Sequence, residues 1–147
     1  MSVTTTTIQP LTSSLERLLI FKEVFTQHIQ TCEKIITGNC LARDTLLDLK
    51  NYLTKNLLHF NPFVQSLRGV SVPNGYEQEY NTILGAVTRY RNAIEDIIGA
   101  ISHDGVDTIP FRMSVKQQRS ALAWIDGAYI DTLRLQAGQF GQCSMVG

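Results

Sequence analysis

An uninterrupted apolar heptad repeat from Tyr80 to Ile101 is the feature that most constrains the fold of this chain. Its a and d positions are filled by Tyr80, Ile83, Val87, Tyr90, Ile94, Ile97 and Ile101. Alanine occupies every g position, at residues 86, 93 and 100. A repeat of this kind predicts a helix that packs closely against other helices along one face.

Two arginines lie in the middle of this repeat, Arg89 at position c and Arg91 at position e, beside the apolar seam. A guanidinium group stays charged in proteins and is rarely buried without a partner. Arg91 therefore needs an acidic partner, a break in the helix or an anionic ligand. The sequence leaves these three alternatives open.

The composition indicates one soluble domain. The chain has 147 residues, 44% of them hydrophobic, which is enough to bury a core within a single domain, residues 1–147. Thirteen basic residues balance 13 acidic ones, so a charged partner must be bound by a local patch. No signal peptide or membrane span is recognisable, and we expect no membrane partner. Cys32, Cys40 and Cys143 lack metal-ligand spacing and fit reduced thiols of an intracellular protein.

Three further segments have helical periodicity. The first is predicted from Ser13, with a capping box to Glu16, to just before Gly38. The second runs from about residue 41 to residue 60, where Asn61-Pro62 breaks or restarts it. The last runs from a capping box at Ser114 to residue 138, and its predicted buried side comprises Leu122, Ile125, Tyr129 and Leu133.

Together the four segments predict an all-α fold, an antiparallel up-down four-helix bundle with an extended N-terminal arm (1–12) and a C-terminal tail (139–147). In this arrangement both termini and the 61–75 loop lie at one end. The 38–41 link and the 102–113 loop lie at the other, so we expect the two ends to differ in role. The alanines of the third helix are expected to face Ala121 and Ala128 of the last helix.

Signatures of enzymes, metal sites and cofactor sites are absent from the sequence. It contains no Glu-x-x-His pair, no Cys-x-x-Cys-His motif and no glycine-rich phosphate loop. Arg91-Asn92 matches part of the ribonuclease motif of HEPN domains, but Asp96 stands where that motif needs histidine. We therefore expect no catalytic activity, no cofactor, no metal and no small-molecule substrate.

The basic residues are the stronger candidates for a functional site. Arg112, Lys116 and Arg119 follow one another without an intervening acid, and the last two lie in the first turns predicted for the final helix. Cations are disfavoured there by the helix dipole, which weakly indicates a bound anion. With Arg89 and Arg91 they form a candidate groove for a phosphate chain. The alternative is that these side chains form ion pairs within the protein. The cations of the final segment, Arg112, Lys116 and Arg119, would then pair with Glu95 and Asp96, and Arg89 or Arg91 would pair with Asp126.

A group of acids flanks the same loop and comprises Glu95, Asp96, Asp104 and Asp107. As a carboxylate cluster they would make an assembly sensitive to pH, because crowded acids ionise reluctantly. The alternative interpretation is a solvated loop.

The order of these features resembles that of the coat proteins of rod-shaped plant viruses of the tobacco mosaic virus type. The resemblance runs along nearly the whole chain and is carried by Ser2-Val-Thr-Thr-Thr, Cys32, Thr37-Gly-Asn39, Ala42-Arg43-Asp-Thr45, Val70-Ser-Val-Pro73, Tyr80-Asn-Thr-Ile-Leu84, Gly85-Ala-Val-Thr-Arg-Tyr-Arg91, Tyr129-Ile-Asp-Thr-Leu133 and Gly138-Gln-Phe140. The family's paired aspartates near the start of the last helix have no match, since Lys116-Gln117 stands there.

The resemblance implies a homo-oligomeric subunit that stacks into a helical tube around single-stranded RNA, in the virion and the host cytoplasm. It implies that Arg89 and Arg91 contact RNA phosphates and that the third helix distorts or ends near them. Arg112, Lys116 and Arg119 are positional candidates for the same role. The alternative is a non-viral helical-bundle adaptor that binds a partner protein and no nucleic acid.

Overall fold

The computed structural model describes the backbone of residues 2–38, 43–72, 74–102 and 105–146, and the side chains of 13–38, 46–72, 74–102, 105–132 and 134. Its helices are α1 (Ser2–Ile36), α2 (Arg43–Arg68), α3 (Glu77–Gly99) and α4 (Thr108–Val146). Two short strands, β1 (Ile101–Ser102) and β2 (Gly105–Val106), lie between α3 and α4. None of the described helices is long and apolar enough to cross a membrane.

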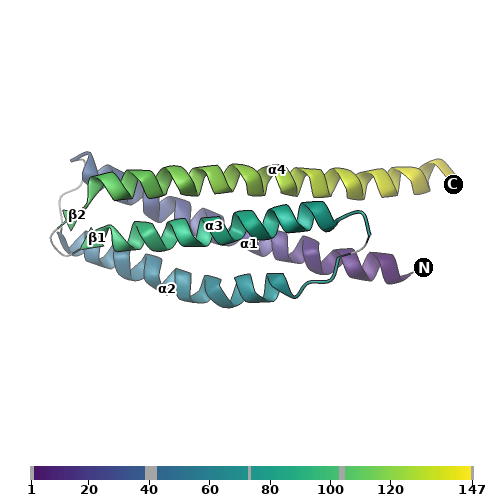
Figure 1. The fold of residues 1–147 in the computed structure, drawn as a ribbon, viewed down its shortest axis with the longest axis horizontal. Coiled ribbons are helices and arrows are strands. Elements are labelled where there is room, and N and C mark those ends of the chain that lie inside the picture. The colour runs from purple at the N-terminus through teal and green to yellow at the C-terminus, as the bar shows by residue number, and fades with distance from the viewer. Residues whose placement is uncertain (1, 39–42, 73, 103–104, 147) are drawn as a thin grey trace.

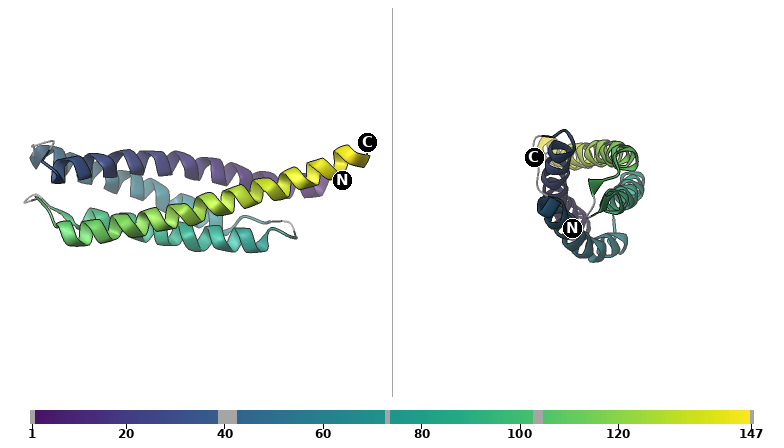
Figure 2. Two further views of the ribbon diagram at one scale, coloured as in Figure 1. Left: turned by 90° about the horizontal axis from the view of Figure 1, so that it is seen from above. Right: turned by 90° about the vertical axis from the view of Figure 1, so that its left-hand side faces the viewer.

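The four helices lie side by side and alternate in direction (Figure 1), and viewed end-on they are arranged in a ring (Figure 2). Buried side chains from all four helices form one core. The predicted antiparallel four-helix bundle is confirmed. α1 begins and α4 ends at the end of the bundle away from β1 and β2 (Figure 1). We call the opposite end, where these strands pair, the hairpin end. Ile101 pairs with Val106 and Ser102 with Gly105 in an antiparallel register.

The heptad of α3 is buried as predicted. Every a, d and g residue from Tyr80 to Ile101 belongs to the interior, and Ile83, Val87 and Tyr90 are fully buried. Tyr90 packs edge-on against Phe25 of α1 and Phe60 of α2, with both pairs of ring centroids 6.0 Å apart. This seam therefore holds three helices around one aromatic centre.

The contact between α3 and α4 is the most extensive between any two elements. Ala86, Ala93, Ala121 and Ala128 are all buried in it. Because alanine side chains are short, they let the two helix backbones approach closely. The predicted alanine contact between the third and fourth helices agrees with this burial.

The first and last helices begin earlier than the sequence predicts. α1 begins at Ser2 instead of Ser13, and α4 begins at Thr108 instead of Ser114 and continues to Val146. The Ser114 hydroxyl donates to the Pro110 carbonyl at 2.7 Å, so this residue lies inside the helix and is not its cap. The segments expected as an arm and a tail are helical at 2–12 and 139–146. Extending a formed helix costs less than starting one, because nucleation carries the entropic penalty.

The predicted break at Asn61-Pro62 is also wrong, since α2 continues through Pro62 to Arg68. Proline inside a helix costs about 3 kcal/mol through a lost hydrogen bond and a steric clash. The buried stripe of α2 continues on both sides of it, with Phe60, Phe63, Val64 and Leu67. Burying each of these side chains contributes roughly 1.5–3 kcal/mol, which outweighs the cost of the proline.

The predicted end of the first helix is confirmed. α1 ends at Ile36, and Gly38 follows with φ of +85°, where glycine has no steric penalty. Its amide donates to the carbonyl of Ile35 at 3.1 Å. This turn directs the chain from α1 toward α2 at the hairpin end.

Candidate nucleic-acid interface

Arg91 has protein partners in the structure. Its Nε donates to Oδ1 of Asn61 on α2 at 2.8 Å, and its Nη1 donates to Oδ1 of Asn92 at 3.1 Å and to the carboxylate of Glu95 one turn on. The side chain is only 28% exposed. Of the three alternatives for this residue, the acidic partner is the one observed.

Helix α3 continues without a break through Arg89, Tyr90 and Arg91 to Gly99. The expectation that the helix distorts or ends near these arginines is therefore wrong. Burial of the heptad on both sides of Arg91 explains this, because a break would expose Ile94 and Ile97. Arg91 instead reaches its partners from an intact helix.

The predicted pairing of Arg89 or Arg91 with Asp126 is also wrong. Asp126 accepts hydrogen bonds from Nζ of Lys22 on α1, at 2.9 and 3.1 Å. Arg89 is exposed on the side of α3 that faces α4, where it lies near Trp124 and Gln117. It makes no ion pair with any side chain that the structure describes.

The three cations of α4 do share one surface. Arg112, Lys116 and Arg119 line a groove of about 450 Å³ at the hairpin end. The opposite wall is the last part of α1, including Glu33 and Ile36, and the floor contains Phe111 and Val115. We call this surface the basic groove. Of the five predicted RNA contacts, it brings together three, whereas Arg89 faces the α3–α4 side and Arg91 faces α2.

Only one cation of the basic groove is paired within the described side chains. Nη2 of Arg119 donates to both carboxylate oxygens of Glu33, at 2.9 and 3.2 Å. The predicted pairing of Arg119 with Glu95 or Asp96 is therefore wrong. Arg112 and Lys116 are exposed, and neither has an acidic partner in the part of the chain whose side chains are described. Two cations are thus available to an anion that enters the groove.

The helix dipole of α4 acts on fewer of these cations than the sequence indicates. Because α4 begins at Thr108, Lys116 and Arg119 lie beyond its first two turns. Arg112, the fifth residue of α4, lies just beyond the first turn, where the effect of the dipole on a charge is already reduced. The indication for an anion therefore rests on the exposure of Arg112 and Lys116 without acidic partners among the described side chains, and not on the helix dipole.

The carboxylate cluster stays a prediction. Glu95 binds Arg91, Asp96 and Asp107 are exposed, and Asp104 lies outside the described residues. The backbone amide of Asp107 donates to the Ala100 carbonyl at 2.8 Å, which anchors the segment between β2 and α4. Among the described residues, no three histidine, cysteine or acidic side chains are grouped so that they could hold a metal ion.

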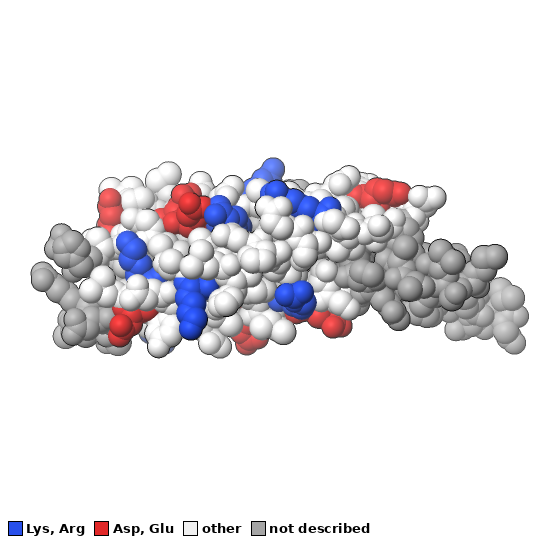
Figure 3. Space-filling view, turned by 90° about the horizontal axis from the view of Figure 1, so that it is seen from below, with Lys and Arg blue, Asp and Glu red and all other residues white. Residues whose placement is uncertain are grey.

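On the face shown in Figure 3, basic and acidic side chains are interspersed and form no large patch of one sign among the described residues. This agrees with the balanced net charge of the sequence.

Burial explains the raised pKa values of the interior groups. Desolvation, with a smaller contribution from the charge of Glu33, raises the pKa of the Cys32 thiol to about 11. Burial also raises the pKa of Tyr90. Cys32 is therefore a protonated core residue.

The sequence does not identify three residues that matter at these surfaces, which are Trp124, Glu33 and Asn61. Trp124 is 57% exposed on α4, although a large apolar residue is expected inside. Its only sequence signal is its place between the buried positions Ala121, Ile125 and Ala128. Glu33 and Asn61 pair with residues far away in sequence, and no local pattern identifies such partners.

Comparisons with protein-family models, with curated proteins and with solved structures find no match.

Proposed function

We propose that this protein is a non-enzymatic coat subunit that assembles into a helical rod around single-stranded RNA. The observation that carries the proposal is the basic groove, with Arg112 and Lys116 free of acidic partners within the described side chains and Arg119 beside them. The family resemblance supports it independently. The proposed locations are the virion and the host cytoplasm.

The basic groove suits contact with the RNA backbone. Phosphates are bound by exposed lysine and arginine side chains whatever the base sequence, as packaging of a whole RNA requires. The groove lies at the hairpin end, away from the start of α1 and the end of α4 (Figure 1). In the family that the chain resembles, subunits lie radially with their termini outward, and the resemblance therefore implies that the hairpin end is the inner one, where every copy presents its groove to the enclosed strand.

The proposed set of RNA contacts is narrower than the sequence prediction. Arg112, Lys116 and Arg119 remain in it. Arg91 is left out, because its Nε and Nη1 already donate to Asn61, Asn92 and Glu95. Arg89 is left out as well, because it lies on the α3–α4 side of the bundle.

The test is the salt dependence of RNA binding by Lys116→Gln, with Lys55→Gln as the matched control. Lys55 is exposed on α2, outside the basic groove, and its replacement changes the net charge equally. Each phosphate contact that is lost lowers the slope of log affinity against log salt by about 1. We expect this change in Lys116→Gln alone. Equal slopes in both variants and the wild type contradict the proposed groove.

The second candidate is a helical-bundle adaptor that binds no nucleic acid. It is favoured by the protein partners of Arg91 and Arg119 and by the exposure of Trp124. The same titration separates the two functions, because an adaptor of this kind shows no RNA binding in any of the three proteins.

A further inference from the structure

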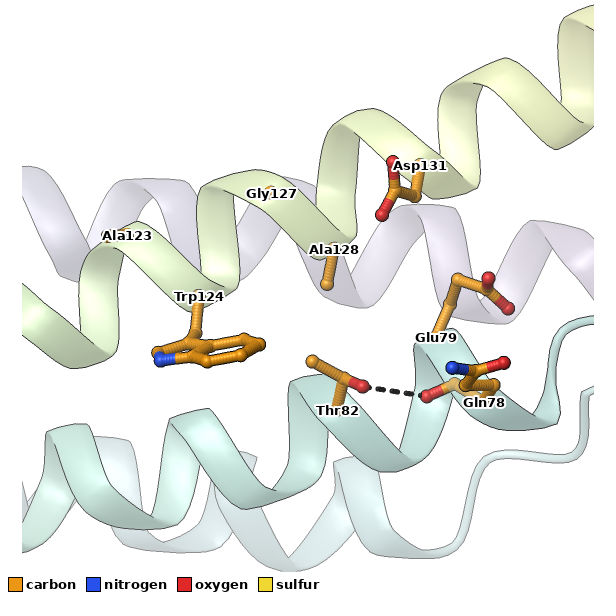
Figure 4. Close-up of a pocket in the computed structure, with 8 residues that line it drawn as sticks. All are labelled: Gln78, Glu79, Thr82, Ala123, Trp124, Gly127, Ala128 and Asp131. Carbon is orange, nitrogen blue, oxygen red and sulfur yellow. Dashed lines mark hydrogen bonds between the residues drawn. The ribbon is translucent and has the colours of Figure 1, made fainter.

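The outer side of the α3–α4 pair carries a groove that no part of the described chain fills. Trp124 stands in it, and the cavities on each side of this indole are lined by both helices. One flanking cavity has a volume of about 350 Å³ and lies between Thr82 of α3 and Ala128 of α4 (Figure 4). We call this surface the Trp124 face. It presents a protruding aromatic ring directly beside an open cavity.

Charges of opposite sign lie at opposite ends of the Trp124 face. Arg89 lies on the side of Trp124 toward the hairpin end. Glu79 and Asp131 lie beyond the cavity on the other side, on facing helices (Figure 4). We call these two residues the acidic pair.

Within the described residues of one copy, the charges of the Trp124 face have few partners, and the only ion pair among them is a long one made by Asp131. One carboxylate oxygen of Glu79 is buried and accepts no hydrogen bond within the described residues. Asp131 is exposed, and its nearest cation in the same part of the chain is Arg134, at 4.0 Å. Arg89 makes no ion pair there either. A cation beside the acidic pair would therefore be bound favourably.

Two glycines lie between these charges, Gly85 on α3 and Gly127 on α4. A methyl group added at either position meets nothing within 4 Å. Packing within one copy thus does not require glycine there, although glycine inside a helix is less stable than alanine. The open space they leave allows a second backbone to approach.

These features are related by a simple symmetry. Arg89 and Glu79 are separated by about 15 Å along α3, and the point midway between them is next to Gly85. A twofold axis can be placed in the plane of the Trp124 face so that it runs across α3 and α4 at the level of Gly85. Rotation about this axis brings Arg89 of a second copy to the same level along the helices as the acidic pair. The same rotation carries Trp124 to the level of Thr82, where the cavity is (Figure 4).

We propose that the Trp124 face is the interface of an antiparallel, twofold-symmetric dimer of this chain. Each Trp124 fills the cavity of the second copy, and each Arg89 binds the second copy's acidic pair. The Trp124 face carries both a protruding ring and a cavity that can receive it, and both members of an ionic contact. Such a surface is complementary to a second copy of itself. Buried tryptophan and arginine are also the residues that most often dominate binding energy at interfaces.

The dimer is a form of the RNA-free protein, and it does not depend on the proposed RNA binding. An antiparallel pair holds its two basic grooves at opposite ends. A tube requires all grooves at its inner radius, so the dimer has to dissociate before subunits join such a tube. The free protein is thereby kept from assembling without RNA.

A charge-exchange experiment on RNA-free protein tests this interface by sedimentation equilibrium. Arg89→Glu places a third acid against each acidic pair, and Asp131→Arg places a cation against each Arg89. We expect both variants to be folded by circular dichroism, and to be monomers at concentrations where the wild type is a dimer.

Mixing the two variants provides the decisive arm of this experiment. The new glutamate of one copy then lies against the new arginine of the other, and the second ionic contact of the interface has its native residues. We therefore expect the mixture to form a dimer.

Trp124 gives a second readout, because it is the only tryptophan in the chain. Its fluorescence emission is expected to shift to shorter wavelength in the wild type and in the mixture, and to stay at longer wavelength in each variant alone. Lys55→Glu changes the charge equally on another helix and is expected to dimerise like the wild type. Gly85→Gln, whose side chain projects into open space, is expected to be a folded monomer.

Several results overturn the proposal. The proposal is wrong if the wild type is a monomer at all concentrations. It is also wrong if either variant alone forms a dimer as readily as the wild type. A mixture that stays monomeric excludes the antiparallel arrangement, because that arrangement brings position 89 to the level of position 131. Since no RNA is present, none of these results bears on the basic groove.

Discussion

At the scale of single residues, the sequence identifies which side chain needs a partner but not the partner itself. The heptad predicts that Arg91 lies beside the seam, and the half-buried side chain agrees. Asn61 comes from another helix, so its contact with Arg91 depends on how α2 and α3 are rotated. Such a rotation is set by packing of the whole core and cannot be deduced from one helix.

Arg91→Ala is expected to reduce the free energy of unfolding by about 1–2 kcal/mol, because charge-assisted hydrogen bonds to Asn61 and Glu95 are lost. Urea denaturation measures this change. Arg68→Ala, at the exposed end of α2, is the control and is expected to change stability by less than about 0.5 kcal/mol. If Arg91→Ala weakens RNA binding and leaves stability unchanged, Arg91 is a ligand contact after all.

Cys32 is expected to make stability fall in alkaline solution. Its pKa rises from 9.0 to about 11 on folding, so the folded state retains a proton that the unfolded state loses. The resulting stabilisation is complete below about pH 9 and is lost as the pH rises toward 11. Its size is on the order of 2–3 kcal/mol.

Urea denaturation of the wild type and Cys32→Val across this pH range measures the contribution of the thiol. Valine has similar volume and does not ionise, so the variant is expected to lose less stability between pH 9 and 11. Parallel pH profiles for the two proteins contradict the assignment, because the remaining alkaline loss is then due to other groups such as Tyr90.

At the scale of elements, the quality of prediction depends on the size of the buried side chains. The large heptad residues of α3 predict its buried face correctly. On α4 the buried positions include Ser114, Gln118 and Thr132, whereas Leu122 and Tyr129 are only half-buried. Hydrophobic periodicity therefore predicts this side only in part: Ile125 is buried, Leu122 and Tyr129 pack half-buried against the core, and the side chain of Leu133 lies outside the described residues. The polar buried positions escape a pattern that counts only apolar residues.

The central glycines of α3 and α4 provide a test at this scale. Gly85→Ala and Gly127→Ala are each expected to stabilise the monomer by about 0.5–1 kcal/mol, because alanine restricts the unfolded chain and its methyl group meets nothing within 4 Å. Denaturation is measured at protein concentrations low enough that the wild type is monomeric. Destabilisation in either variant contradicts the open space described at that position.

At the scale of the whole molecule, the bundle and the placing of its ends follow from four helical segments and short connections, and the structure agrees. The basic groove is predicted only in part. Arg112, Lys116 and Arg119 are identified from the sequence as candidates, but their separation from Arg89 and Arg91 is visible only once the helices are assembled. The Trp124 face is a property of two helices together and has no signature in either segment.

The most direct measurement of the central claim is electron microscopy of the protein mixed with single-stranded RNAs of several defined lengths. We expect rods of uniform diameter whose length increases in proportion to the length of the RNA. Replacing both Arg112 and Lys116 with glutamine is expected to abolish the rods and to leave the bundle folded. If the wild type forms no rods with any RNA, or rods whose length is independent of the RNA, the coat-subunit function is contradicted.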